Sequence, residues 1–596
     1  MNKTRTLKDV EALRGYLRQH HLAAFIFPST DPHNGEYVPE HWAARKWISG
    51  FDGSAGTAVV TLTEAALWTD SRYFLAAEDQ LAGTGYQLMK EGMPGTPTIA
   101  QWLTSVLHGG DTVGLDGWVN SVASVEALRK ELQPAGLSLN TSLDPTQELW
   151  IYRAGLPTIP IKVHPLKYAG EDTQSKLARL RAQMAALGAD MTIICPLDGI
   201  AWITNLRGQD MPFNPVFVSY LTITHDGATL FVNPEKLTNE VKAYLHDQGI
   251  DTLPYDAVAA TMATTKPCTL LIDPQACNCQ VLPPEGKGWS IVKHASIVAP
   301  MKAIKNEVEQ EGFRHAMLRD GVALVKFLRW LKPAVKAGGE TELSVDLRLT
   351  AQRAEQPLFR DNSFGTIAAY AHHGAIVHYE ANRETDLTLE PHGMLLLDSG
   401  AQYLDGTTDI TRTIPLGPLT QEERVDYTLV LKGHIRLATV KFPAGTCGTQ
   451  LDVLARYAMW QHGINYMHGT GHGVGSYLCV HEGPHQIRMN HMPTPLMPGM
   501  TVTNEPGIYR AGKHGVRIEN TMMVTEYTEG EFGHFLQLEP LTLCPIDMEP
   551  ILWDMMQNDE VEYLNAYHAH VREALSPRLS GKDLEWLLKA TEPHNI

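Results

Sequence analysis

Four carboxylates and one histidine between positions 398 and 519 are the residues of this chain best suited to chemistry. They are Asp398, Asp409, His472, Glu505 and Glu519. Each lies beside a turn or at the end of a strand-like run. Carboxylates that converge in a partly buried site repel each other strongly unless cations neutralise them. Four carboxylates balance two divalent ions, so this set predicts an oxygen-rich site for two metal ions.

The first two acids are expected to meet in a hairpin. Residues 394–397 are apolar and run into Asp398, and a β-branched run follows Asp409. The turn signal at Asp405-Gly406 is off-centre between these runs, so the register of the two strands stays open. The pairing still predicts that both aspartates lie at one end of the hairpin.

The last two acids follow the same pattern of strand, acid and turn. Residues 499–503 lead to Glu505, which a Pro-Gly turn follows, and residues 516–524 form a β-like run that contains Glu519. Any one of these acids alone is more often a turn residue, so the inference depends on the whole set. The repeated pattern predicts internal pseudosymmetry in this part of the chain.

Residues 481–485 match the H-E-x-x-H motif of zinc proteases. That mechanism requires both histidines on one face of a helix, and Pro484 inside the turn would cost about 3 kcal/mol. We therefore reject a zinc-protease site, keep His481 as a single loop histidine and assign no role to His485. The glycines of residues 469–475 also lack the Lys-Ser/Thr that follows a phosphate-binding loop.

The N-terminal half contains the same order of segments twice. A helical pattern, an apolar strand and two β-like runs occupy residues 7–17, 22–28, 57–60 and 66–70, and again residues 177–184, 191–196, 221–224 and 229–233. This repetition predicts a duplicated α/β module. The proline-bearing stretch 156–160 is expected to link the two copies.

A third domain is expected to contain the acids. Its predicted first helix covers residues 305–331 and ends at Pro333, and its last helical region, residues 561–588, is broken at Pro577. The predicted domains are residues 1–157, 158–302 and 303–596.

Composition excludes several classes of partner. The chain has a net charge of −18, which argues against nucleic acid or an anionic membrane as a partner. Residues 1–19 lack the apolar stretch of a signal peptide, and no apolar run approaches the roughly 20 residues that a membrane span needs. The seven cysteines form no disulfide framework, and Cys277 and Cys279 lack further zinc ligands nearby. We therefore expect a cytoplasmic protein with reduced thiols.

Taken together, the motifs resemble those of the pita-bread metallopeptidases, which include methionine aminopeptidase, prolidase and aminopeptidase P. The segments most similar to the three-domain, cytosolic form of the aminopeptidase P (Xaa-Pro aminopeptidase) family are 398–403, 405–409, 468–475 and 480–484. The resemblance covers essentially the whole chain and is most specific from His372 to Leu543. It implies an α/β (α+β) fold, with two creatinase-N-like α/β domains followed by a C-terminal pita-bread catalytic domain.

The resemblance also implies a role for each member of the metal set. Asp398 would bind one metal ion in a bidentate way, and Asp409 and Glu519 would bridge both ions. His472 and Glu505 would each complete one coordination sphere. The expected cofactors are two divalent ions, most simply Mn²⁺, with Co²⁺ or Zn²⁺ as substitutes.

Further residues match positions that do not bind metal. His378, His468 and His481 match the active-site histidines of the family, both for catalysis and for substrate binding, and Tyr509 and Arg517 match positions near its proline pocket. A lone histidine is more often a polar core or loop residue, but these three lie close in sequence to the expected ligands.

The implied reaction is hydrolysis of the first peptide bond ahead of proline. Two ions that share a water lower its pKa enough to supply hydroxide near neutral pH. Glu505 is the candidate that takes the proton, and His481 with a metal ion would stabilise the oxyanion. Proline has a fixed φ and no N–H in a peptide, so a pocket made by His468 and Tyr509 is expected to select it by shape.

Other readings remain open at this point. The resemblance implies peptides with proline in second position as substrates and a homodimer as the assembly. A prolidase, which cleaves only Xaa-Pro dipeptides, is the nearest alternative. A non-catalytic pita-bread binding module, or a metal-free creatine-cleaving relative, is the more distant one, and both are disfavoured because the full ligand set is present.

Overall fold

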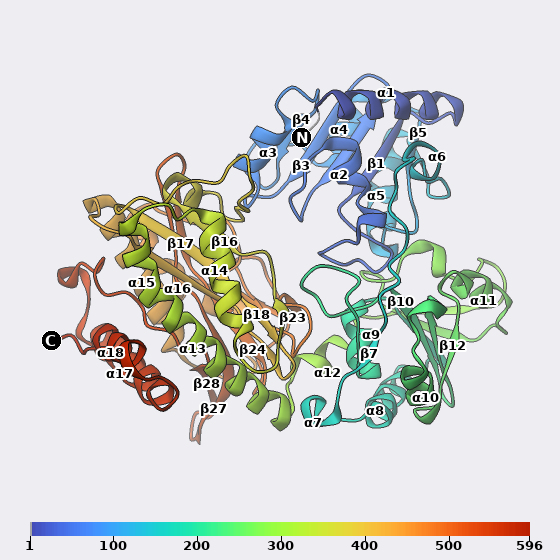
Figure 1. Ribbon diagram of the computed structural model, residues 1–596. Helices are drawn as coiled ribbons and strands as arrows, with labels where there is room; N and C mark the ends of the chain where they lie inside the picture. The colour runs from blue at the N-terminus through green and yellow to red at the C-terminus, as the bar shows by residue number, and fades with distance from the viewer. Residues whose placement is uncertain (1–2, 596) are drawn as a thin grey trace. The chain divides into compact units, whose positions relative to one another are not determined.

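The N-terminal half of the chain contains two six-stranded sheets with the same topology. The computed structural model describes residues 3–595. The first sheet has the order β4-β3-β2-β1-β5-β6, and the second has the order β12-β11-β10-β8-β13-β14 (Figure 1). In both sheets the first strand of the copy pairs antiparallel with one neighbour and parallel with the other. The duplicated module predicted from the sequence is therefore confirmed.

Corresponding elements of the two copies have similar lengths and the same order. The strands of the first sheet are β1 (Ala24–Pro28), β2 (Thr57–Thr61), β3 (Ala65–Thr69), β4 (Gln87–Lys90), β5 (Thr112–Leu115) and β6 (Ser138–Asn140). The strands of the second are β8 (Met191–Ile194), β10 (Ser219–Thr224), β11 (Ala228–Val232), β12 (Ile250–Leu253), β13 (Thr269–Ile272) and β14 (Ser290–Lys293). Helices α1 (Lys3–Gln19) and α8 (Thr173–Ala186) precede β1 and β8, and each buries apolar residues at helical spacing.

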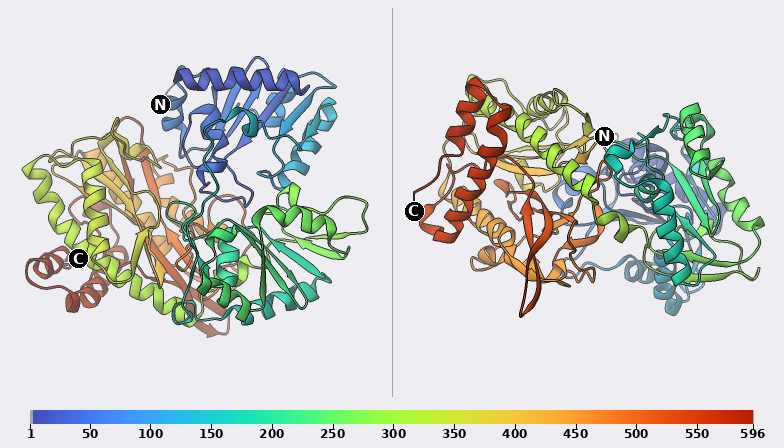
Figure 2. Two further views of the ribbon diagram at one scale, coloured as in Figure 1. Left: turned by 45° about the vertical axis from the view of Figure 1, so that its right-hand side comes forward. Right: turned by 90° about the horizontal axis from the view of Figure 1, so that it is seen from below.

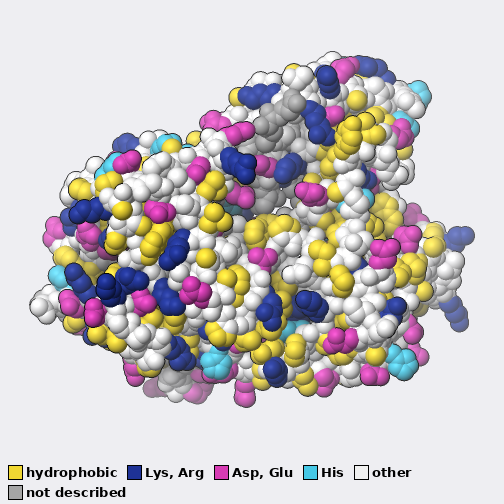
Figure 3. All heavy atoms as spheres, viewed as in Figure 1, with side chains coloured by type: hydrophobic (Ala, Val, Ile, Leu, Met, Phe, Trp, Pro, Cys, Tyr) yellow, Lys and Arg dark blue, Asp and Glu magenta, His cyan; other side chains and the backbone are white. Residues whose placement is uncertain are grey.

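The chain divides into two units. The N-terminal unit comprises Met1–His164 and Glu171–Val298, and the C-terminal unit comprises Pro165–Gly170 and Ala299–Ile596. The three domain boundaries given above stay a prediction. Acidic and basic side chains are interspersed on the face of the molecule shown in Figure 3.

The C-terminal unit contains two pairs of helices, each next to a sheet. In the first half, the paired helices α13 and α14 accompany the sheet β16-β17-β20. In the second half, the paired helices α15 and α16 accompany the sheet β21-β28-β27-β24. Figures 1 and 2 show α13 and α14 along one face of the strands of this unit. The two sheets differ in strand number, three in the first half and four in the second, so the expected pseudosymmetry stays a prediction.

The bounds of these elements place the acids at strand ends. The helices are α13 (Glu307–Ala337), α14 (Glu342–Ala354), α15 (Gln421–Ala438) and α16 (Gly448–Trp460). The strands are β16 (Ile367–Tyr370), β17 (Met394–Ser399), β20 (Ile410–Pro415), β21 (Lys441–Pro443), β24 (Thr501–Asn504), β27 (Asn520–Gly530) and β28 (Gly533–Pro540). Strands β18 (Ala401–Tyr403) and β19 (Gly406–Thr407) form the excursion between β17 and β20, and they make a small sheet with β15 (Phe359–Asn362).

The prediction that the first helix of this unit ends at Pro333 is wrong, because α13 continues to Ala337. A proline inside a helix removes one backbone hydrogen bond and normally ends it. Here Leu331 and Val335, on either side of the proline, are at most 1% exposed, so packing holds the last turn in place. Val308, expected in the packed face, is 41% exposed.

Two other predictions about elements have mixed outcomes. Residues 516–524 form parts of two strands, β26 (His514–Arg517) and β27. The chain leaves the hairpin of β25 (Gly507–Arg510) and β26 at Arg517 before it enters another sheet. The C-terminal region contains α17 (Asn558–Leu575) and α18 (Gly581–Ala590) with a break around Pro577, as predicted.

Among residues 3–595, no helix has the length and apolar character needed to cross a bilayer.

A buried histidine in α17 predicts a measurable dependence of stability on pH. His568 is fully buried, and its Nε2 accepts a hydrogen bond from the backbone N–H of Ile546 at 3.1 Å. Burial, reinforced by nearby Arg412, lowers the pKa of His568 to about 4. In the unfolded chain the same group titrates near pH 6.5, so acid favours unfolding. The stabilising effect of the neutral ring is complete above about pH 6.5 and is lost as the pH falls toward 4.

The expected measurement compares wild type with His568→Gln, which keeps an acceptor but has no titrating group. Urea unfolding at pH 7 and pH 5 should show the wild type losing about 1.4 kcal/mol per pH unit relative to the variant once below pH 6.5. A constant difference between the two proteins over this range would contradict the buried neutral state of His568.

Candidate metal centre

Asp398 and Asp409 lie at the same end of a hairpin, as predicted. Strand β17 pairs antiparallel with β20, and in this register Asp398 faces Thr411 and Ser399 faces Ile410. Asp409 immediately precedes β20, so it lies next to the paired end of β17. Asp398 is 7% exposed and Asp409 4% exposed. The hairpin thus places the carboxylates of Asp398 and Asp409 in a largely buried space.

Glu505 and Glu519 enter the same space from the second half of the unit. Glu505 follows β24, and its backbone N–H donates to the carbonyl of Thr470 at 2.8 Å. Glu519 precedes β27, and its backbone N–H donates to the carbonyl of Thr411 at 3.1 Å. The Thr411 hydroxyl donates to the Glu519 carboxylate at 2.9 Å. Hydrogen bonds between Thr411 and Glu519 therefore connect the two halves next to the acids.

His472 lies on the short strand β22 (Gly471–Gly473), which pairs with β23 (Glu482–Ile487). A Cβ atom on Gly471 would lie 1.9 Å from the carbonyl oxygen of Thr503, so only glycine permits this close approach of β22 to β24. The His472 ring donates from Nδ1 to the carbonyl of Gly473 at 2.9 Å. That bond leaves Nε2 unprotonated in the neutral ring, which is the state of a metal-binding imidazole.

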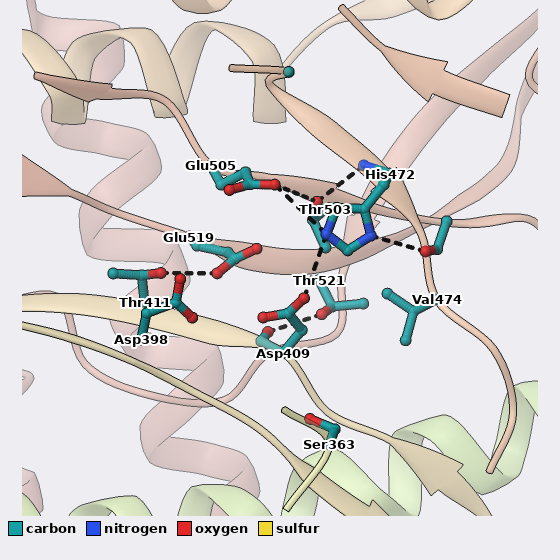
Figure 4. A network of polar contacts seen from close by, with 12 residues as sticks. Ser363, Asp398, Asp409, Thr411, His472, Val474, Thr503, Glu505, Glu519 and Thr521 are labelled. Atoms are coloured by element: carbon teal, nitrogen blue, oxygen red, sulfur yellow. Dashed lines mark hydrogen bonds and ion pairs between the residues drawn. The ribbon is translucent and has the colours of Figure 1, made fainter. Parts of the chain in front are cut away.

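The five residues converge on one point. Nε2 of His472 lies 3.5 Å from Oδ2 of Asp409 and 3.5 Å from Oε1 of Glu505. Ligand atoms of Asp409, His472 and Glu519 lie within 4.8 Å of one another. Figure 4 shows the carboxylates of Asp398, Asp409, Glu505 and Glu519 directed toward a common space beside the His472 ring.

The electrostatics of this arrangement call for cations. Burial, together with the charges of Asp398 and Glu505, raises the pKa of Asp409 well above its ordinary value. Burial, and next the charge of Asp409, likewise raises the pKa of Glu519 well above its ordinary value. Burial raises the pKa of Glu505 to about 7. Among the described residues, Oδ1 of Asp398 is buried and has no hydrogen-bond partner. Carboxylate oxygens and one imidazole suit divalent ions of the Mn²⁺, Co²⁺ or Zn²⁺ type, so the residues fit a two-metal site.

A hydrogen-bonded chain leads away from Asp398 to His468. Nη2 of Arg517 donates to Oδ2 of Asp398 at 2.7 Å, and its Nη1 donates to the hydroxyl of Tyr509 at 2.8 Å. The Tyr509 hydroxyl lies 2.7 Å from Nε2 of His468. Arg517 is 1% exposed, and the His468 and Tyr509 rings meet edge to face. Three predicted substrate-binding residues thus form one connected wall beside the acids.

The other two predicted histidines also lie near the acids. The His481 ring packs on the His472 ring, with centroids 4.4 Å apart and planes at 88°. A charge on His481 would lower the pKa of both Asp409 and Glu505, which places it near both carboxylates. His378 is half-buried and follows Val377, whose carbonyl accepts from Arg517 at 3.4 Å. All predicted site residues are therefore in one region of the C-terminal unit, while their individual roles stay predictions.

The rejected zinc-protease motif lies on a strand, not a helix. Glu482 to His485 belong to β23, and Glu482 binds Lys302 and Lys305. Nε2 of His485 lies 2.6 Å from the carbonyl of Thr501, within hydrogen-bond distance. The rejection is confirmed, and His485 belongs to the core.

Several residues that orient the acids were not predicted. The hydroxyl of Thr503 accepts from the backbone N–H of His472 at 3.0 Å and donates to Glu505 at 3.4 Å. Thr411 plays the corresponding part for Glu519. A threonine two residues from an acid at a strand end was visible in the sequence at both places. Threonine is common in strands, so this signal alone has little specificity.

Sequence profiles of known families match the chain in order. Two profiles described as Creatinase/Prolidase N-terminal domain match residues 10–146 and 153–309. The profile of Metallopeptidase family M24 matches residues 311–526, and a profile of its C-terminal region matches residues 534–594. The metal-ligand candidates all fall within the M24 match.

Full-length relatives are also found. Aminopeptidase P2 of Arabidopsis thaliana is 41% identical over 614 residues, which cover 96% of this chain and 86% of the relative. Xaa-Pro aminopeptidase 1 of Dictyostelium discoideum is 37% identical over 619 residues, which cover 100% and 97% of the two chains. These alignments include both N-terminal copies as well as the site.

Solved structures agree with this picture. The X-prolyl aminopeptidase from Caenorhabditis elegans, described as a cytosolic enzyme with a di-nuclear active site, has a TM-score of 0.94 at 34% identity and covers 100% of both chains. An Xaa-Pro dipeptidase from Bacillus anthracis has a TM-score of 0.51 at 23% identity and covers 63% of this chain, which indicates a shared fold only.

Proposed function

We propose the following activity on the premise that this chain belongs to the Xaa-Pro aminopeptidase (aminopeptidase P) family, within the M24 metallopeptidases. The chain hydrolyses the first peptide bond of peptides that have proline in second position and releases the N-terminal amino acid. The expected fold, two creatinase-type α/β domains followed by a pita-bread domain, is confirmed. The observation that carries the proposal is the convergence of four carboxylates, three of them buried, and His472 on one point.

The proposed metal ligands are the five residues of that centre. We propose that these side chains would hold two divalent ions, Asp398 one of them, Asp409 and Glu519 both, and His472 and Glu505 one each. Mn²⁺ is the proposed native metal, with Co²⁺ or Zn²⁺ as substitutes. Two divalent ions at this place would lower the pKa of a water molecule and polarise the scissile carbonyl.

The side chains around the centre supply the remaining functions. Glu505 lies 3.5 Å from His472 and is the proposed acceptor of the water proton. His481, which packs on His472, is the proposed donor to the developing oxyanion. Arg517 neutralises part of the charge of Asp398 and holds Tyr509 in place.

Proline recognition is assigned to the connected wall of His468, Tyr509 and Arg517. The Tyr509 hydroxyl is held from both sides, by His468 at 2.7 Å and by Arg517 at 2.8 Å. A wall fixed in this way can distinguish a rigid pyrrolidine ring from a flexible side chain by shape. His378 is the proposed additional substrate-binding histidine, from the segment that follows Val377.

The peptide that best tests the activity is Arg-Pro-Pro. With Mn²⁺ present, the chain is expected to release arginine from it, whereas removal of metal with EDTA should abolish release and added Mn²⁺ should restore it. Mass spectrometry of the products against Arg-Ala-Pro as a matched control peptide shows whether the second residue must be proline. Cleavage confined to the dipeptide Arg-Pro would instead identify a prolidase.

We also propose that the protein is a cytoplasmic homodimer with domains at residues 1–157, 158–302 and 303–596. An apolar stripe on α16 supports the dimer: Val453, Tyr457 and Trp460 recur at helical spacing and are 41%, 60% and 40% exposed. The C. elegans structure described as cytosolic supports the location.

The stripe predicts the effect of a charge on assembly. Trp460→Asp is expected to shift the protein from dimer to monomer in sedimentation velocity, because a carboxylate placed in an apolar interface lacks a partner. Phe532→Asp, at an 87% exposed position outside α16, provides a comparison. A wild-type protein that sediments as a monomer at all concentrations would exclude the dimer.

A further inference from the structure

Glu482, the residue after His481, forms a buried ion-pair cluster with two lysines. Its carboxylate binds Lys302 through Oε2 and Lys305 through Oε1. The three side chains are 0%, 3% and 1% exposed. Nζ of Lys305 also donates to the backbone carbonyl of Lys302 at 3.1 Å. One carboxylate therefore ties two neighbouring lysines to the first residue of β23.

The lysines come from the segment that begins the C-terminal unit. Lys302 lies in α12 (Ala299–Ala303), and Lys305 lies between α12 and α13. Helix α12 packs against β23. A buried lysine is costly unless a charged partner compensates it, so neither lysine can leave Glu482 without a large penalty. The cluster thus fixes the start of β23 to this segment.

The start of β23 also lies next to the metal centre. Glu482 is the backbone partner of Gly473, next to His472, at a point where the register of β22 and β23 shifts. A Cβ atom on Gly475 would lie 3.0 Å from Oε2 of Glu482, so the carboxylate lies against the glycine-rich segment after His472. His481, one residue earlier, has its ring on His472. His481 lies in a bend immediately before β23, and its ring and the Glu482 carboxylate have different neighbours.

We propose that Lys302 and Lys305 are positioning residues for His481 and that they act through Glu482. This inference rests on the proposed function, in which His481 stabilises the oxyanion. It gives the glutamate of the former zinc-protease motif a role: its charge anchors the strand whose preceding histidine faces the reaction. It also makes the start of the C-terminal unit a part of the machinery that orients a catalytic side chain.

A purely structural ion pair would behave differently from a positioning one. The chain offers a matched control in the N-terminal unit, where Lys236 and Asp210 form an ion pair with both side chains 0% exposed. Lys236→Met removes the same kind of buried charge far from the site in the sequence. Comparison of Lys305→Met with Lys236→Met therefore separates loss of stability from loss of His481 positioning.

The experiment measures kcat and KM for Arg-Pro-Pro in Mn²⁺-loaded, full-length protein. Lys305→Met and Glu482→Gln are expected to lower kcat by about 10- to 100-fold with little change in KM, the range seen when residues that orient active-site groups are removed. Lys305→Arg, which keeps the charge, should recover most of the activity. Lys236→Met should keep kcat within about twofold.

A double-mutant cycle with His481→Ala supplies the decisive comparison. If Lys305 acts through His481, Lys305→Met should reduce kcat much less in the His481→Ala background than in wild type. Equal losses in both backgrounds, or an unchanged kcat in Lys305→Met and Glu482→Gln, would overturn the proposal. Circular dichroism and metal content of each variant show that the comparison is made on folded, loaded protein.

A crystal structure of Glu482→Gln gives a second result that does not depend on activity. The proposal predicts that the His481 ring moves away from its 4.4 Å contact with His472 while the acids stay in place. An unmoved ring would overturn the positioning role even if the wild type failed to cleave Arg-Pro-Pro. A wild type that failed to cleave the peptide, with a displaced ring in the variant, would count against the proposed function alone.

Discussion

Asp398→Asn is expected to abolish turnover and leave the fold intact. One oxygen of Asp398 is paired with Arg517 and the other is buried without a partner among the described residues, so asparagine fits the space but lacks the charge a divalent ion needs. The charge of Asp398 also raises the pKa of Asp409 and Glu519, so its removal relieves repulsion in the metal-free protein. We expect kcat to fall by at least about a thousandfold, as for loss of a central catalytic group.

The measurement combines kinetics on Arg-Pro-Pro with metal analysis and thermal unfolding. The variant should bind less than the wild-type amount of Mn²⁺ and should unfold, without metal, at a temperature no lower than wild type. Asp361→Asn is the matched control, because Asp361 is an exposed acid of β15 outside the centre and should keep full activity. Full residual activity in Asp398→Asn would contradict the assignment of the centre.

Arg412→Met is expected to cause the largest loss of stability in the C-terminal unit. The guanidinium of Arg412 is 4% exposed and donates to the backbone carbonyls of Glu519 at 2.6 Å and Cys544 at 2.8 Å. It also donates to the side chains of Asn520 at 2.9 Å and Tyr567 at 3.0 Å. Each buried acceptor left unsatisfied costs about 1–3 kcal/mol, so the free energy of unfolding should fall by roughly 5 kcal/mol or more.

Urea unfolding in the presence of EDTA measures this effect without a contribution from metal binding. Arg360→Met is the control: Arg360 is exposed, contacts only the neighbouring carbonyl of Phe359 in the described hydrogen bonds, and should change stability by less than about 0.5 kcal/mol. If Arg412→Met proved as stable as this control, Arg412 would not be the link between β20, Glu519 and α17 described above.

Local patterns were enough to predict the acids of the site and the elements that end in them. The apolar run before Asp398 and the β-branched run after Asp409 predicted a hairpin, and the structure pairs these strands. The acid–turn pattern at Glu505 likewise placed a strand before it. These features depend on neighbouring residues, which is why they could be read from the sequence.

What the sequence alone could not give depends on contacts between distant segments. The role of Arg412 requires partners more than 100 positions away, and the pairing of Glu482 with Lys305 spans 177 positions. The continuation of α13 through Pro333 likewise follows from packing that outweighs a local preference. From the sequence alone, charged residues such as Arg412, Glu482 and Lys305 are expected at the surface, and only the fold shows that they are buried.

The most direct test of the central claim is a crystal structure of the Mn²⁺-soaked protein with anomalous diffraction measured for manganese. Two anomalous peaks about 3.5–4 Å apart are expected among Asp398, Asp409, His472, Glu505 and Glu519, with Asp409 and Glu519 between them. Acids that point apart around a centre without manganese would contradict the account.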